Sequence, residues 1–132
     1  MVKVNDLVVL KAILKDTKVG KMSNEGLRAY LKLSLTMNKY ASEFEDKRTS
    51  LITDTVSSKG YDIQKITPEQ DREIFNVIAP ILDEFLGQEV DIETKVLSWD
   101  DICNGILNLE DNEKLSVDDK TKITQYLCKD EL

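Results

Sequence analysis

The sequence predicts a mainly α-helical single domain, residues 1–132, in which a helical bundle surrounds one long helix beside a short two- or three-stranded β ribbon. Three observations support this fold class. Helical periodicity without proline runs from Ser23 to about Asp54, a strongly apolar helical stripe follows Pro68, and one brief alternation of period two lies near Val90. The length of 132 residues is that of one ordinary domain.

A first helix is expected over residues 5–16. Asn5 or Asp6 is its expected cap, and apolar residues recur at helical spacing behind the cap. A turn containing Gly20 follows, and Ser23 or Asn24 then caps the long helix.

The long helix, residues 23–54, is too long for a chain of this size to cover on every side, so the other elements or a partner must pack against it. Two of its leucines, Leu33 and Leu35, lie off the main apolar seam, which includes Leu27, Tyr30 and Leu31. They are either covered within the domain or available to a partner or a second copy. Beyond Ala41 charged residues dominate, so we expect that half to be exposed and to project. The candidate interaction residues are Leu33, Leu35, Glu43, Glu45 and Asp46.

A polar, mobile loop is expected over residues 55–66, followed by a helix–strand–helix–helix part over residues 67–132. Thr67, Pro68 and Gln70 form a clear helix start. The stripe behind them is expected to complete the core around the first half of the long helix, and Pro80 is expected to kink or split this helix. The stripe consists of Ile74, Phe75, Ile78, Ile81, Leu82, Phe85 and Leu86.

Alternating residues predict a strand from Val90 to Val96. Its possible partners are residues 2–4 or residues 62–66. Ser98 and Ser116 each open a further helix with acidic residues in the first turn, the first of them running through Leu107.

Composition excludes several classes of function. The chain has no histidine, which removes histidine-based catalysis and mixed Cys/His zinc sites, and no stretch resembles a phosphate-binding loop. Its two cysteines, Cys103 and Cys128, are expected to be small buried residues in a reducing compartment. A net charge of -7 argues against nucleic acid as a ligand. We expect no cofactor. No signal peptide or membrane span is apparent, so a cytoplasmic location is expected.

One segment, residues 100–111, approaches the pattern of an EF-hand calcium loop. Asp100, Asn104 and Gly105 match it, whereas Ile102 cannot ligate and Asp111 replaces the longer glutamate. A capped helix is the favoured interpretation. The alternative is a metal-binding regulator or metal-dependent enzyme that uses Asp100, Asp101, Asn104 and Asp111. The last four residues, 129–132, spell a retrieval signal but are expected to be the polar end of a terminal helix.

The order of elements, with the segments NDLVVLKAIL, ASEFEDKRTSLI, EFLGQEVDIE and LSWDDI, resembles small helical proteins of unassigned function encoded by bacteriophages and prophages. The resemblance covers nearly the whole chain as a pattern and assigns no functional residue. It implies a bacterial host cell, or a virion, as the setting. We expect a non-enzymatic interaction module, either a virion or assembly component or an inhibitor of a host nucleic-acid-binding system. It would contact a protein partner or a second copy through helical surface, without a membrane.

Overall fold

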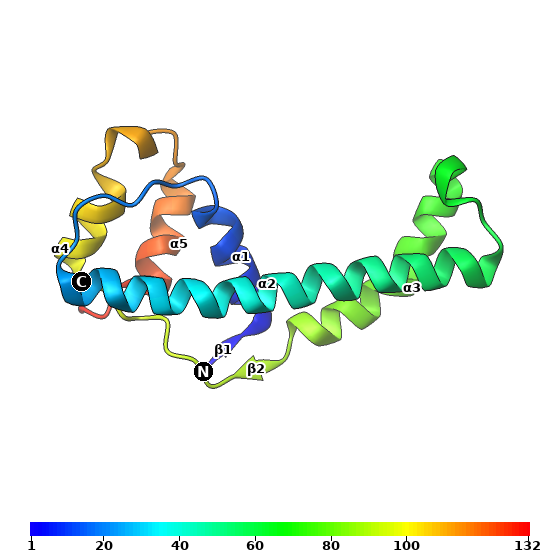
Figure 1. Ribbon diagram of the computed structural model, residues 1–132, viewed down its shortest axis with the longest axis horizontal. Coiled ribbons are helices and arrows are strands. Elements are labelled where there is room, and N and C mark those ends of the chain that lie inside the picture. The colour runs from blue at the N-terminus through cyan, green and yellow to red at the C-terminus, as the bar shows by residue number, and fades with distance from the viewer.

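The computed structural model describes residues 1–132 and shows a helical body from which a two-helix arm projects (Figure 1). A two-stranded antiparallel ribbon lies between them, with Val2 opposite Val90 and Lys3 opposite Glu89. The mainly α fold around one long helix, with a minor ribbon, is therefore confirmed. The elements are β1 (Val2–Lys3), α1 (Val4–Leu14), α2 (Asn24–Lys59), α3 (Pro68–Leu86), β2 (Glu89–Val90), α4 (Trp99–Ile102) and α5 (Val117–Leu127), with a π-helical turn (Cys103–Leu107) and two 3-10 turns (Ile63–Lys65 and Glu110–Asn112).

The body packs α1, α4 with its π-helical turn, and α5 around the first half of α2 (Figure 1). On α2, Tyr30, Leu33 and Met37 face this core at helical spacing. The Tyr126 hydroxyl on α5 donates a hydrogen bond to the Asp6 carboxylate on α1 at 2.9 Å, which ties two of the surrounding helices together. The core consists of Leu7, Leu10, Leu14, Tyr30, Leu33, Met37, Leu97, Ile102, Ile106, Ile123, Leu127 and Cys128.

Helix α1 begins one residue earlier than expected, and its cap differs. Lys3 occupies the cap position, and its backbone N–H donates to the Asp6 carboxylate at 3.0 Å. Asp6 therefore caps the helix from its first turn and not from the cap position itself. The helix ends at Leu14, two residues before the expected Asp16.

Helix α2 extends to Lys59, five residues past the expected end at Asp54. The mobile loop expected over residues 55–66 is therefore wrong in its first part, where Thr55 and Val56 are buried in the helix. Val56 packs against Ile74 and Ile78 of α3. These residues are distant in sequence, so the polar residues around Val56 gave no indication of the contact. Gly60 then ends the helix in the left-handed conformation, with φ of 69°, which glycine adopts without strain.

The arm consists of the second half of α2, from Phe44, the connection at its tip, and α3, so it covers residues 44–86. Helix α3 starts with the expected capping box: the Gln70 N–H donates to the Thr67 hydroxyl at 3.2 Å, and the Thr67 N–H donates to the Gln70 side chain at 3.1 Å. The stripe on α3 was expected to cover the first half of α2, and this is wrong. Because the connection after Gly60 is short, α3 starts at the far end of α2 and packs there.

Pro80 does not split α3, which is one continuous helix from Pro68 to Leu86. The residue is exposed and lies near the end of the helix. The carbonyl that loses its partner therefore has solvent at hand, which removes the main cost of an internal proline.

The expected strand over residues 90–96 is wrong for most of its length, which is irregular. Two tight turns lie within it, where the Ile92 N–H donates to the Val90 carbonyl at 3.0 Å and the Val96 N–H donates to the Thr94 carbonyl at 2.9 Å. Only Glu89 and Val90 pair, because β1 has two residues before α1 begins at Val4. Residues 2–4 were correctly identified as a possible partner, whereas residues 62–66 form a 3-10 turn at the arm tip. Farther along, Leu97 forms an isolated parallel bridge with Cys128.

The last residues, 129–132, do not continue a helix as expected. Helix α5 ends at Leu127, and Cys128 adopts an extended conformation because it pairs with Leu97. The Lys129 N–H donates to the Leu97 carbonyl at 2.9 Å, and the Asp130 carboxylate accepts the Trp99 N–H at 2.8 Å. None of the helices combines the length and hydropathy that a membrane span requires.

Candidate protein-interaction surface

The arm has a small core of its own, separate from that of the body. Val56 of α2 and Ile74, Ile78 and Leu82 of α3 are its buried residues. Only five of the 22 buried residues of the chain lie within residues 44–86, so the arm is thinly covered. The partly buried apolar residues around this core are Phe44, Leu51, Ile52, Tyr61 and Ile66.

The apolar face of α3 is wider than its one neighbour can cover. At about 100° per residue, Phe75 and Val77 lie about 160° apart around the helix, with Ile74 and Ile78 between them. Helix α2 covers the middle of this arc and leaves both edges exposed. Phe75 is 64% exposed at one edge, and Val77 and Ile81 are exposed at the other. One neighbour, α2, therefore covers only part of the apolar face of α3.

A groove runs along the Phe75 edge, where α2, α3 and the 3-10 turn at the tip meet. Its volume is about 510 Å³. Ile63, in the tip turn, is 59% exposed beside it. Seven of its ten lining residues are apolar, an apolar share typical of a binding surface and unusual for a solvated helix pair. The lining residues are Arg48, Ile52, Val56, Ile63, Ile66, Asp71, Arg72, Ile74, Phe75 and Ile78.

Charges of both signs border the groove. Arg48 and Arg72 lie on its rim together with Asp71. Arg48 also forms an ion pair with Glu45 one turn earlier, at 3.6 Å, and both side chains are half exposed. Such a pair is weak in water, so the arginine is available to a carboxylate that a partner brings.

The tip of the arm is fastened by Tyr61, whose hydroxyl donates a hydrogen bond to the Glu73 carboxylate on α3. This hydrogen bond raises the pKa of Tyr61, because the phenol must keep its proton to donate. The contact holds the connection after α2 against the first turns of α3, and it therefore keeps the Ile63 turn beside the groove.

The candidate interaction residues on α2 are placed on different faces. Leu33 is 4% exposed and belongs to the body core, so its assignment to an outer surface is wrong. Leu35 is 72% exposed and continues a ridge with Leu31, one turn before it, and Leu27, two turns before it. The prediction of the core face was wrong because the apolar seam in the sequence groups Leu27 and Leu31 with Tyr30, which is the core residue among the three.

The acidic candidates Glu43, Glu45 and Asp46 are all exposed on α2, at the start of the arm. None of them lines the groove, although Glu45 pairs with Arg48 on its rim. The sequence analysis missed Ile63 and Phe75, the two most exposed apolar residues of the groove. Phe75 was assigned to the core stripe, and the available signal was the excessive width of that stripe.

The residues proposed for a metal site do not form a loop. Residues 99–107 are helical, through α4 and the π-helical turn, and Asp111 lies in the following 3-10 turn. The helical conformation contradicts an EF-hand geometry, in which ligands converge from an irregular loop. Asp100 and Asn104 are exposed, and the Asp101 carboxylate is bound by Ser23. No group of three Cys, Asp or Glu side chains in the structure is placed to share a metal ion.

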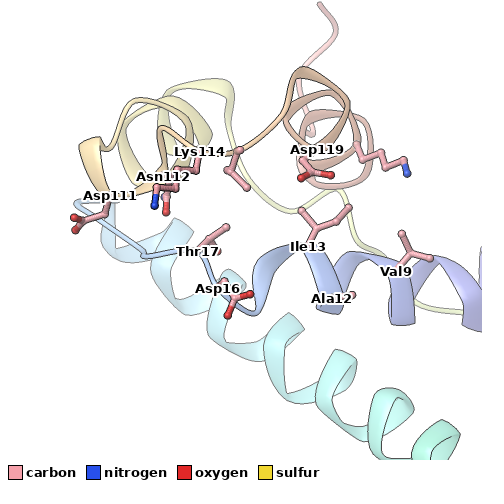
Figure 2. A pocket seen from close by; sticks show the side chains of 11 residues that line it. Val9, Ala12, Ile13, Asp16, Thr17, Asp111, Asn112, Lys114 and Asp119 are labelled. Carbon is pink, nitrogen blue, oxygen red and sulfur yellow. The ribbon is translucent and has the colours of Figure 1, made fainter.

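A second hollow, of about 560 Å³, lies in the body between α1, the turn after the π-helix and α5 (Figure 2). Its acidic residues Asp16, Asp111 and Asp119 come from three segments and do not converge on one point (Figure 2). Asn112 beside them is 3% exposed and fully occupied by hydrogen bonds to the backbone of Lys18 and Ile106. The hollow therefore offers no free buried polar group for a ligand.

The cysteines do not form a reactive site either. Cys128 is buried in the body core and Cys103 is partly buried next to it. Burial raises the pKa of the Cys103 thiol, and the nearby Asp100 adds to this effect. A raised pKa keeps the thiol protonated and unreactive at neutral pH.

Comparison of the chain with protein-family models, with curated proteins and with solved structures returned no match.

Proposed function

We propose that this protein is a non-enzymatic protein-interaction module that binds its partner through the arm. The observation that carries the proposal is the uncovered apolar face of α3, with Phe75 and Ile63 exposed beside a largely apolar groove. Single exposed apolar residues are common on protein surfaces, but a contiguous groove bordered by charges is characteristic of interaction sites.

The architecture supports the same proposal. A helical hairpin that projects from a body presents its surface to partners without steric interference from the rest of the chain (Figure 1). The pairing of an apolar centre with a charged rim is also the usual anatomy of a protein interface. Under this proposal, the expected setting is that of the phage-encoded proteins that the sequence resembles, with a virion, assembly or host protein as the partner class.

Site-specific photo-crosslinking tests the proposal. Benzoylphenylalanine replaces Phe75 on the arm, Leu35 on the leucine ridge, or Val117, which is an equally accessible apolar residue on the body. The three variants are irradiated in lysate of the source organism, and the products are separated by mass. The proposal expects a discrete product from position 75 and none from position 117. Equal products from all three positions, or a product from position 35 alone, would contradict it.

A further inference from the structure

We infer that the groove of the arm is filled by the arm of a second copy of this chain, so that two arms pair about a two-fold axis as a four-helix bundle. The inference rests on the proposed function, because it names the partner of the same surface. Three properties of the arm support it: the area it exposes, its shape, and the signs of its charges.

The exposed area is larger than a monomer of this mass should have. A folded monomer of 15.0 kDa is expected to expose about 7,050 Å² from the scaling of surface with mass. The chain exposes 8867 Å², which is about 1,800 Å² more than that expectation. A stable dimer of standard size buries about 800 Å² on each partner. The excess is therefore sufficient for an interface, and the arm contributes four exposed large apolar residues to it, Ile63, Phe75, Val77 and Ile81.

The shape of the arm suits a partner identical to itself. A two-fold interface uses the same patch on both copies, so the patch must contain both a protrusion and a hollow. Phe75 and Ile63 are 64% and 59% exposed among the residues that line the groove, so each copy has both apolar side chains to insert and a hollow to receive them. A two-fold axis near Phe75 lets each phenyl ring enter the groove of the other copy.

The charges are compatible with the same arrangement. Two copies that each carry a net charge of -7 repel one another unless the contact surfaces are locally balanced. The rim of the groove is balanced in this way, because Arg48 and Arg72 lie beside Asp71 and Arg48 also pairs with Glu45, so these four charges sum to zero. In an antiparallel pair, an arginine of one copy can therefore approach the Asp71 carboxylate of the other. The second copy would also cover the Phe75 edge of α3, which α2 leaves exposed.

Analytical ultracentrifugation of the full chain tests the inference. The wild type is expected to sediment with twice the mass of 15.0 kDa over a wide range of concentrations. Phe75→Asp and Ile63→Asp are each expected to reduce the mass twofold, with an unchanged far-ultraviolet circular dichroism spectrum. Both side chains are largely exposed, so these substitutions leave the arm core intact. Leu35→Asp, on the exposed ridge of the body, is the matched control and should remain dimeric.

Each other outcome has a defined meaning. A wild type that stays monomeric at every concentration overturns the inference. A dimer that the two arm variants leave intact also overturns it, and if Leu35→Asp abolishes that dimer the contact lies on the leucine ridge. The proposed function is judged separately by the photo-crosslink at position 75. A product with a mass other than that of two chains keeps the arm as an interaction surface and rejects the second copy as its occupant, whereas no product rejects both.

Discussion

The carboxylate of Asp101 accepts two hydrogen bonds from Ser23, one from its backbone N–H at 2.8 Å and one from its hydroxyl at 2.8 Å. The Ser23 hydroxyl in turn accepts the N–H of Gly26 at 3.0 Å and so caps α2. Asp101 thus connects the start of α4 to the start of α2, although 78 residues separate it from Ser23. The negative charge also lies at the positive end of the long helix, where it is favourable.

The stability of the fold should depend on the ionisation of Asp101. Its pKa lies below the ordinary value of 3.8, first because of the Ser23 N–H and then because of the Ser23 hydroxyl. Because the pKa is lower in the folded state than in the unfolded state, the ionised carboxylate stabilises the fold at pH values above 3.8. This contribution is lost as the pH falls through the lowered pKa. We expect Asp101→Asn to lower the free energy of unfolding by about 1 kcal/mol at neutral pH, and by progressively less as the pH falls below 3.8.

Urea unfolding of the two proteins across this pH range measures the difference. The neighbouring residue Asp100 is exposed and does not bind Ser23, so Asp100→Asn is the control and should leave the free energy of unfolding nearly unchanged. A destabilisation by Asp101→Asn that does not change with pH would contradict the assignment.

Glycine should be required at position 26 because of the neighbouring Asp101 side chain, and not because the backbone there needs a conformation that only glycine adopts. A methyl group at position 26 would overlap the Asp101 carboxylate. We therefore expect Gly26→Ala to destabilise the fold, although alanine is the better helix former by about 1 kcal/mol. In a protein that also carries Asp101→Ala, the same change should become neutral or stabilising. A double-mutant cycle measured by thermal unfolding should give a coupling energy of about 1–3 kcal/mol. Additive effects of the two changes would argue against direct contact.

Asn112 should be the polar residue to which the body is most sensitive. Its side chain accepts the Lys18 N–H at 2.9 Å and donates to the carbonyls of Lys18 and Ile106 at 2.8 and 2.9 Å. Asn112→Ala leaves the buried Ile106 carbonyl and the partly buried backbone groups of Lys18 without these partners, at an expected cost of about 2–3 kcal/mol in the free energy of unfolding. Chemical denaturation measures it, with the exposed Asn108→Ala as the control. Equal costs for the two variants would refute a special role for Asn112.

The arm should unfold locally without the body, because the two core clusters share no residue. Ile78→Ala opens a cavity in the small arm core, a change that costs about 2–4 kcal/mol at a buried isoleucine. We expect faster hydrogen exchange in the second half of α2 and in α3, with the protection of α1 and α5 retained. Ile123→Ala, in the body core, is the converse control and should increase exchange in the body. Uniform loss of protection in Ile78→Ala would mean that arm and body unfold as one unit.

Local signals in the sequence predicted the helix starts well. Ser23, Thr67, Ser98 and Ser116 all cap helices, because a cap depends only on the residue itself and on the N–H groups that follow within one turn. The long helix was predicted for a similar reason, since its periodicity is a local property. The weak β signal also gave the correct first partner for residues 89–90.

Features that depend on distant residues were predicted poorly. Helix α2 continues past Asp54 because Ile74 and Ile78 bury Val56, and nothing near Val56 in the sequence indicates that contact. The strand was overestimated because its length is set by β1, which α1 interrupts. Leu33 and Leu31 were assigned to the wrong faces because two apolar stripes on one helix cannot be ranked until the neighbours are known. The groove was missed for the same reason.

The unbroken course of α2 gives the molecule a fixed length scale. Neither proline nor glycine interrupts the helix between Gly26 and Gly60, and its 36 residues span about 54 Å at about 1.5 Å per residue. Such a helix acts as a ruler that sets how far the arm tip stands from the body. It also sets a rotational phase, because each residue added or removed turns the tip by about 100°. The distance between the arm tip and the body can therefore change without rotating the arm relative to the body only in steps of about seven residues, or two full turns.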